Sequence, residues 1–195
     1  TNNKFFITII LDEEDDEQKI FDSVNSLGKD LTNADIIKNY LYQKMKNLVD
    51  ASMLDEILKN HDKYWTNIFY SDENRSFWET EKILGRIKSN NLESFLKDFA
   101  TIKGIYKPSE TGGIDGLAKS YKKYINKNLT TYNELVLFSK ELAEYAQCYY
   151  DYTTNYNNLD SFKIGDMVNT TLLVLDKTET STFNPYVMKL LKEKP

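Results

Sequence analysis

The sequence predicts a mainly α fold, an irregular multi-helix bundle with one short strand at its front. Three observations carry this prediction. The 195 residues include only 3 prolines and 7 glycines, which favours long helices over a fold with many turns. Apolar residues recur at helical spacing through most of the chain. Only Phe5–Leu11 has the β-branched and aromatic composition of a buried strand.

The strand predicted at Phe5–Leu11 has no second convincing strand to pair with. An unpaired strand leaves its backbone N–H and C=O groups without hydrogen-bond partners. Because the first residue is also Thr1 rather than methionine, we expect a piece of a longer protein, cut within or just after a region that contains a sheet. The alternative is an ordinary N-terminal edge segment that lies against the helices.

A first helix and a turn are expected directly after the strand. The acidic run Asp12–Glu17 is typical of a first helical turn, where the helix dipole favours negative charge. Gly28 suits the left-handed residue that ends such a helix. The sequence Thr32-Asn33-Ala34-Asp35 then resembles a capping box and predicts a second helix that extends to Leu48.

Later helices are expected wherever apolar residues repeat every three or four positions. The capping box Thr131-Tyr132-Asn133-Glu134 begins a long one, and Asn184-Pro185 begins a last short one. The other predicted helices are Met53–Tyr70, Ser76–Ser89, Leu92–Ile102, Leu117–Ile125 and Phe162–Asp176.

Composition excludes several classes of function. The formal net charge of −5 argues against strong sequence-independent nucleic-acid binding by this chain alone. Cys148 is the only cysteine and His61 the only histidine, so a cysteine-based zinc cluster and a multi-histidine metal site are excluded. No stretch of about 18 apolar residues occurs. We therefore expect a cytoplasmic protein with no membrane partner and no cofactor held by this chain.

Other candidate motifs have simpler explanations. The segment TGGIDG lacks the lysine and hydroxyl pair of a phosphate-binding loop and no strand precedes it. Tyr145, Tyr149 and Tyr152 have the spacing of a packed helix face, which favours a role in the core over base stacking. Lys122, Lys123 and Lys127 lie near a helix end, where positive charge complements the dipole without any ligand.

The segment Phe21–Asn39, which we call the elbow, carries the candidate site. One helix ends at Gly28 and another begins after Thr32, so the connecting turn presents Asn25, Ser26 and Lys29 to an anion or to neighbouring backbone. A tight helix-turn-helix with good caps is the architectural alternative, and the residues alone favour it.

A family resemblance favours a functional site at the elbow over the architectural alternative. The elbow resembles the second signature of the ParB/sulfiredoxin-like NTPase (GmrS-type) domains of bacterial GmrSD-like, modification-dependent restriction endonucleases and related phage-defence proteins. The matching positions are Phe21, Val24, Asn25, Ser26, Gly28, Leu31, Thr32, Asp35, Ile37, Lys38 and Asn39. Looser similarity extends to the C-terminus, through Tyr121–Tyr124, Ala143–Tyr150 and Asn184–Tyr186. The family's first signature, Asp-Gly-Gln-Gln-Arg, is missing here, as is its histidine-containing nuclease domain.

The resemblance implies a fragment with two parts. Residues 1–50 would be the end of the NTPase core, and residues 51–195 a helical connector. Asn25, Ser26, Gly28 and Lys29 would form one edge of the nucleotide site. The elbow would be held together by Phe21, Leu31, Thr32, Asp35, Lys38 and Asn39.

The partners implied are the missing NTPase core and the nuclease domain of the same protein. Through the full-length protein, NTP, a divalent metal ion and DNA would bind, whereas the fragment alone would not turn over NTP. The hypothesis from a different class is a non-catalytic helical scaffold for protein contacts.

Overall fold

A computed structural model describes residues 31–84, 87–106, 116–155, 167–178 and 180–193. Contacts divide the chain into two units, residues 1–32 and 33–195, and every described helix and strand belongs to the second. This unit is a mainly helical, irregular bundle, as predicted. The predicted strand Phe5–Leu11 and the first helix lie outside the described residues, and the predicted division at residue 50 stays a prediction.

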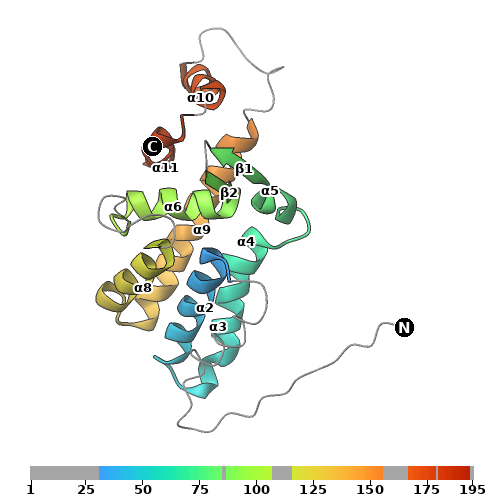
Figure 1. Cartoon of the computed structure of the whole chain (residues 1–195). Coiled ribbons are helices and arrows are strands. Elements are labelled where there is room, and N and C mark those ends of the chain that lie inside the picture. Colours follow the sequence, from blue (N-terminus) through green and yellow to red (C-terminus); the bar gives the residue numbers. More distant parts are fainter. Residues whose placement is uncertain (1–30, 85–86, 107–115, 156–166, 179, 194–195) are drawn as a thin grey trace. The chain divides into compact units, whose positions relative to one another are not determined.

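The helices of the second unit follow the predicted order (Figure 1). Their bounds are α2 (Asn33–Lys46), η1 (Ala51–Met53), α3 (Leu54–His61), η2 (Asp62–Thr66), α4 (Asn67–Phe69), α5 (Arg75–Glu79), α6 (Asn91–Ile102), α8 (Gly116–Asn128), α9 (Tyr132–Asn155), α10 (Met167–Lys177), η4 (Ser181–Phe183) and α11 (Asn184–Glu193). The predicted helix Met53–Tyr70 is confirmed as one nearly continuous run from η1 to α4. Within that run, η2 is a π-helical turn.

The long helix α9 is the central element, because α2, α4, α6 and α11 all contact it. Its predicted capping box is confirmed. The Glu134 carboxylate accepts the N–H of Thr131 at 2.9 Å, and the Thr131 hydroxyl accepts the N–H of Glu134 at 3.3 Å. The predicted burial of Tyr145, Tyr149 and Tyr152 on this helix is also confirmed.

A set of buried rings, which we call the aromatic core, joins α4, α5, α6 and α9. It consists of Phe69, Trp78, Phe95 and Tyr149. The Trp78 ring stacks on Tyr149 with centroids 5.8 Å apart, and it meets the edge of Phe69 at 4.9 Å. Large buried rings with such geometries add to the burial of apolar surface, so this cluster is a principal source of stability.

The prediction of a helix over Ser76–Ser89 is wrong beyond α5. Residues Glu81–Leu84 (β1) and Ile87–Asn90 (β2) form an antiparallel hairpin in which Leu84 pairs with Ile87. Helix α5 ends because Thr80 takes an extended conformation with ψ 120°. The apolar spacing fits either structure. The overlooked signal is Gly85-Arg86, since glycine at the first position is typical of a two-residue hairpin turn.

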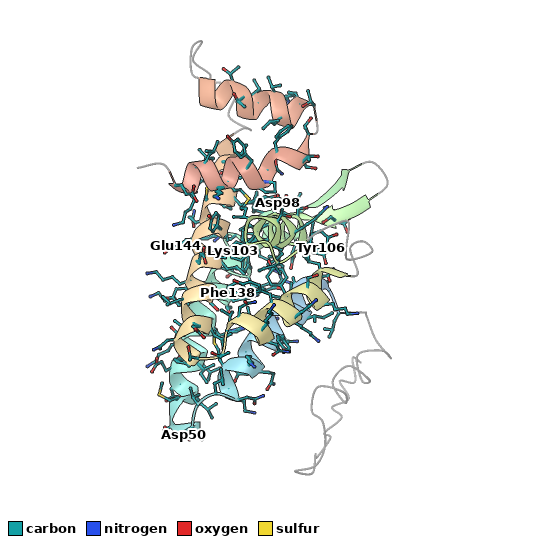
Figure 2. All side chains as sticks on the ribbon, turned by 90° about the vertical axis from the view of Figure 1, so that its left-hand side faces the viewer. Asp50, Asp98, Lys103, Tyr106, Phe138 and Glu144 are labelled. Atoms are coloured by element: carbon teal, nitrogen blue, oxygen red, sulfur yellow. The ribbon has the colours of Figure 1, made fainter. Side chains whose placement is uncertain are left out.

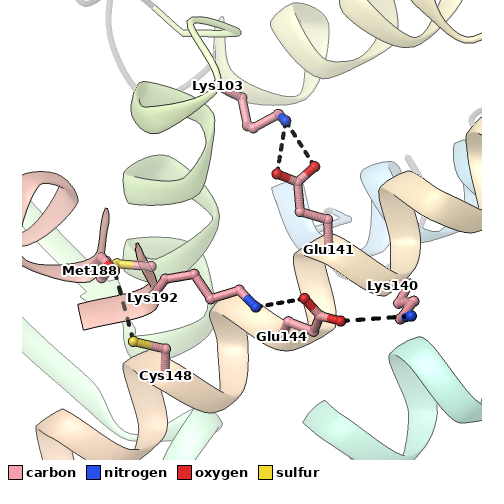
Figure 3. Close-up of polar contacts among 7 residues, drawn as sticks. All are labelled: Lys103, Lys140, Glu141, Glu144, Cys148, Met188 and Lys192. Atoms are coloured by element: carbon pink, nitrogen blue, oxygen red, sulfur yellow. Dashed lines mark hydrogen bonds and ion pairs between the residues drawn. The ribbon is translucent and has the colours of Figure 1, made fainter. Parts of the chain in front are cut away.

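Helix α6 ends in a Schellman motif. Gly104 has φ +65°, a left-handed conformation that L side chains rarely adopt. The Ile105 N–H donates to the Ala100 carbonyl at 2.8 Å, and the Gly104 N–H donates to the Thr101 carbonyl at 3.1 Å. The adjacent Lys103 ammonium lies 2.8 Å from a Glu141 carboxylate oxygen and thereby ties this end of α6 to α9 (Figure 3).

Helix α11 packs against α6 and α9. Its Met188 side chain is fully buried, and the Cys148 thiol lies 3.9 Å from the Met188 carbonyl oxygen. The Lys192 ammonium is 2.6 Å from Glu144 (Figure 3). In the described ranges, every helix is too short or too polar to cross a lipid bilayer.

Candidate functional site

The residues predicted to form the nucleotide edge, Asn25, Ser26, Gly28 and Lys29, lie outside the described residues, as does Phe21. The described half of the elbow is Leu31–Asn39. In this half, Leu31 is half-buried and Thr32 is exposed. Helix α2 begins at Asn33, directly after the predicted N-cap residue Thr32.

The charged residues of the described half lie close together on one helix. The Lys38 ammonium is 3.5 Å from the Asp35 carboxylate, and it also lies over the Tyr70 ring, 5.2 Å from the centroid. Asp35, Lys38 and Asn39 are all half-buried. Lys38 therefore links the first turns of α2 to Tyr70, the residue after α4, and its charge is balanced locally by Asp35.

Asn33 joins the beginnings of three helices. Its side-chain oxygen accepts the Ala118 N–H of α8 at 3.2 Å, and its own N–H donates to the Glu93 carboxylate of α6 at 3.3 Å. Glu93 in turn donates its N–H to the Asn90 side chain, the N-cap of α6, at 2.8 Å. These bonds satisfy N–H groups that a helix start leaves unpaired. They fix the start of α2 against α6 and α8.

Sequence reasoning missed this junction. Asn33 is separated by 60 residues from Glu93 and by 85 residues from Ala118. Glu93 in a first helical turn is unremarkable in the sequence, because acidic residues are common there. The local signal that was available is Asn33 itself, a short polar side chain suited to helix starts.

A second candidate, Asp98, lies on α6 at its contact with α11 (Figure 2). Burial raises the pKa of Asp98 to about 7, while a hydrogen bond from the Asn184 side chain and the charge of Lys97 act in the opposite direction. Burial also raises the pKa of Tyr149 and of Tyr121, and the Asp98 charge adds to both shifts.

The position of Asp98 explains its chemistry. Its neighbours Phe95, Leu96 and Phe99 are fully buried, so the carboxyl group is partly removed from water by the packing around it. A carboxyl group that exchanges its proton near neutral pH can serve as a general acid or base. Here its partner is the amide of Asn184 at the start of α11, so protonation changes a contact between helices.

The single histidine and cysteine are in structural surroundings. The His61 Nδ1 atom lies 3.4 Å from the Thr66 hydroxyl, its ring meets the Tyr42 ring, and burial lowers its pKa. Burial raises the pKa of Cys148, which disfavours the nucleophilic thiolate. Within the described ranges, no three His, Cys, Asp or Glu side chains gather closely enough to hold a metal ion.

No protein-family model, curated protein or solved structure matches this chain.

Proposed function

We propose that this chain is part of a bacterial defence protein that couples NTP binding or hydrolysis to cleavage of foreign, modified DNA. The elbow contributes one edge of the nucleotide site, and the helices after it form a coupling module. The resemblance of Phe21–Asn39 to the family signature supports this proposal. The structural observation that carries it is the start of α2 at Asn33, which is fixed to both α6 and α8.

Each elbow residue has a role in this proposal. Asn25 and Ser26 donate hydrogen bonds to phosphate or ribose, Lys29 adds positive charge, and Gly28 permits the turn. Nucleotide and a divalent metal ion bind once the NTPase core of the full-length protein completes the pocket. A displacement of the elbow is then passed through Asn33 to α6 and α8, and through their packing to α9.

The test compares variants of the full-length protein. Asn25→Ala is expected to abolish NTP hydrolysis and phage restriction while leaving the thermal unfolding midpoint unchanged. Asn133→Ala, an exposed amide on α9, is the matched control and is expected to retain activity. Loss of folding in Asn25→Ala would instead assign the elbow an architectural role. NTP hydrolysis by the isolated 195-residue chain, abolished by Asn25→Ala, would contradict the expected dependence on the missing core.

The second candidate function is a non-catalytic scaffold for protein contacts. Phe183 at the end of η4 and Tyr186 and Leu190 of α11 have the spacing of one helix side and are 53%, 63% and 48% exposed, so they offer apolar surface to a partner. A full-length Tyr186→Ser variant that loses a protein partner in the absence of nucleotide, with NTP hydrolysis intact, would favour this scaffold over the nucleotide-coupled function.

A further inference from the structure

Positive charge is concentrated on two helices of an otherwise acidic chain. The whole chain has a formal net charge of −5. Helices α2 and α8, by contrast, contain a single acidic residue, Asp35, against seven lysines. The seven are Lys38, Lys44, Lys46, Lys119, Lys122, Lys123 and Lys127.

The two helices lie side by side, so their charges add (Figure 1). Besides the hydrogen bond that α8 donates to Asn33, two contacts made by lysines join them across the seam. The Lys44 ammonium of α2 donates to the Asn126 side-chain oxygen of α8 at 3.2 Å, and the Lys122 ammonium of α8 lies 5.4 Å from the centre of the Tyr40 ring of α2. Neither contact neutralises a charge.

The lysines of α8 lie on the side away from the core. Tyr121 and Ile125 of this helix are fully buried, whereas Lys119, Lys123 and Lys127 are exposed and recur every fourth residue. Side chains at this spacing share one side of a helix. We define the basic face as Lys44 together with the four lysines of α8; its members are Lys44, Lys119, Lys122, Lys123 and Lys127.

The basic face is distinguished by the gathering of five lysines without an ion pair on two adjacent helices. Other lysines of the bundle are paired: Lys103 pairs with Glu141, and Lys140 and Lys192 pair with Glu144. Among the described residues, none of the five lysines of the basic face makes an ion pair. Outside the basic face, the lysines that also lack an ion pair in the described part of the chain are Lys46, Lys59, Lys63 and Lys97. Neighbouring unpaired cations repel one another, so an external polyanion is the natural complement.

We infer that the basic face binds the phosphate backbone of double-stranded DNA without reading its sequence. Lys119 and Lys127 are two turns apart, about 12 Å along the helix, which matches the axial length of about three to four phosphates of one DNA strand. Asn126 and Tyr40 add polar groups of the kinds that contact phosphate and sugar.

Other polyanions fit the basic face less well. A membrane-bound helix buries a face of exposed apolar side chains in the lipid interface, whereas the apolar side of α8 is already in the protein core. The binding of single strands depends on exposed rings that stack on bases, whereas the Tyr40 ring is covered by Lys122. The formal net charge of −5 opposes strong binding, so we expect a modest affinity that depends on the local charge of the basic face and falls steeply with salt.

This inference goes beyond the proposed function, because it requires neither a bound nucleotide nor the residues of the elbow. The experiment titrates the complete 195-residue chain into a fluorescein-labelled 25-base-pair duplex of arbitrary sequence. Fluorescence anisotropy is recorded at 50, 100 and 200 mM KCl. The logarithm of the binding constant is expected to fall with the logarithm of salt with a slope of about −3 to −5, since each phosphate contact contributes about −0.9.

The decisive variant replaces Lys119, Lys123 and Lys127 by glutamine. It is expected to weaken binding at least about tenfold at 50 mM KCl and to reduce the slope by about 3, because each lost phosphate contact removes close to one unit. The matched control replaces Lys59, Lys63 and Lys140, three exposed lysines on other helices, and changes the net charge equally. The control is expected to bind as the unchanged chain does.

Three outcomes would overturn the inference. They are no binding at 50 mM KCl, equal weakening by both triple variants, and lysine-dependent binding to phosphatidylserine vesicles without binding to the duplex. Thermal unfolding of each variant shows that it is folded before binding is compared. Failure of this test leaves the nucleotide-site proposal untouched, because that proposal is tested by NTP hydrolysis in the full-length protein.

Discussion

In the aromatic core, rings pack against rings, whereas on the basic face a tyrosine ring lies under a lysine. The Trp78 and Phe95 rings are buried with centroids 5.6 Å apart, and water is excluded from both. Tyr40 is half-buried and faces the Lys122 ammonium at 5.4 Å. Ring burial contributes several kcal/mol, but an exposed cation–π contact contributes only about 0.5–1 kcal/mol.

The difference shows that the side chains that stabilise the fold and those that carry exposed positive charge lie in different parts of the bundle. The aromatic core joins α4, α5, α6 and α9, and its rings carry no net charge. The basic face lies on α2 and α8, on side chains directed away from the core. Substitutions in the aromatic core should therefore change the free energy of unfolding strongly. Substitutions on the basic face should instead change the affinity for DNA.

The largest effect on stability is expected from Phe95→Ala. The fully buried ring contacts Phe69, Trp78 and Tyr149, so its removal leaves a cavity and should lower the free energy of unfolding by about 3–5 kcal/mol. Urea denaturation followed by tryptophan fluorescence measures this change. Phe183→Ala, at a ring that is 53% exposed, is the control, with an expected loss below about 1 kcal/mol. Similar losses in both variants would remove the distinction between core and surface.

Asp98→Asn tests a carboxyl group at the edge of the core. Because burial raises the pKa of Asp98 from 3.8 to about 7, the folded protein holds this proton more tightly than the unfolded chain does. The resulting stabilisation is complete below about pH 4 and is lost as the pH rises through about 7. The neutral variant should therefore be more stable than the parent at pH 8, by roughly 1–3 kcal/mol.

The difference in the free energy of unfolding between Asp98→Asn and the parent should approach zero at pH 4. Urea denaturation at pH 4 and pH 8 measures it. Asp151→Asn, at an exposed aspartate whose carboxylate accepts a hydrogen bond from Gln147, is the matched control. A variant that is less stable than the parent at pH 8 would contradict the sign of the pKa shift.

Asn33→Ala is expected to have a smaller effect, about 1–2 kcal/mol, because the Ala118 N–H loses its acceptor. Asn33→Asp keeps a side-chain oxygen in place and should therefore retain most of the stability that Asn33→Ala loses. Urea denaturation gives the change in free energy, and hydrogen exchange should show faster exchange at the Ala118 amide in Asn33→Ala only. Equal exchange rates in the two variants would show that Asn33 does not hold α8.

The smallest effect is expected from the triple substitution of Lys119, Lys123 and Lys127 by glutamine. These side chains are exposed and unpaired within the described ranges, so the free energy of unfolding should change by no more than about 0.5 kcal/mol. The same denaturation experiment measures it. A loss above about 2 kcal/mol would mean that the basic face also supports the fold, and the comparison between the two regions would fail.

Local patterns predicted most of the helices correctly. The capping box at Thr131–Glu134 begins α9, Asn184-Pro185 begins α11, and α2 begins after Thr32. These predictions succeed because each signal and the structure that it specifies lie within a few residues. The hairpin at Glu81–Asn90 was missed because its short apolar segments fit a helix as well as a strand.

The junction at Asn33 and the basic face could not be predicted in this way. Both depend on α2 lying beside α8, and nothing within either segment specifies that neighbour. Lys122, Lys123 and Lys127 were interpreted as complements of a helix dipole, but of these three only Lys127 lies in the last turn of α8, where the dipole acts. The combined charge of the basic face becomes apparent only when α2, which contains Lys44, is seen to lie beside α8. The nucleotide edge at Asn25–Lys29 stays a prediction.

The π-helical turn at Asp62–Thr66 has a consequence for changes in chain length. Ile57 and Phe69, both fully buried, are separated by about one residue more than three turns of a regular helix. The wider turn absorbs this surplus residue and returns both side chains to the same side. A deletion at the exposed Lys63 should therefore convert the turn to ordinary helix and be tolerated. The same deletion in the middle of α9 would rotate everything after it by about 100°.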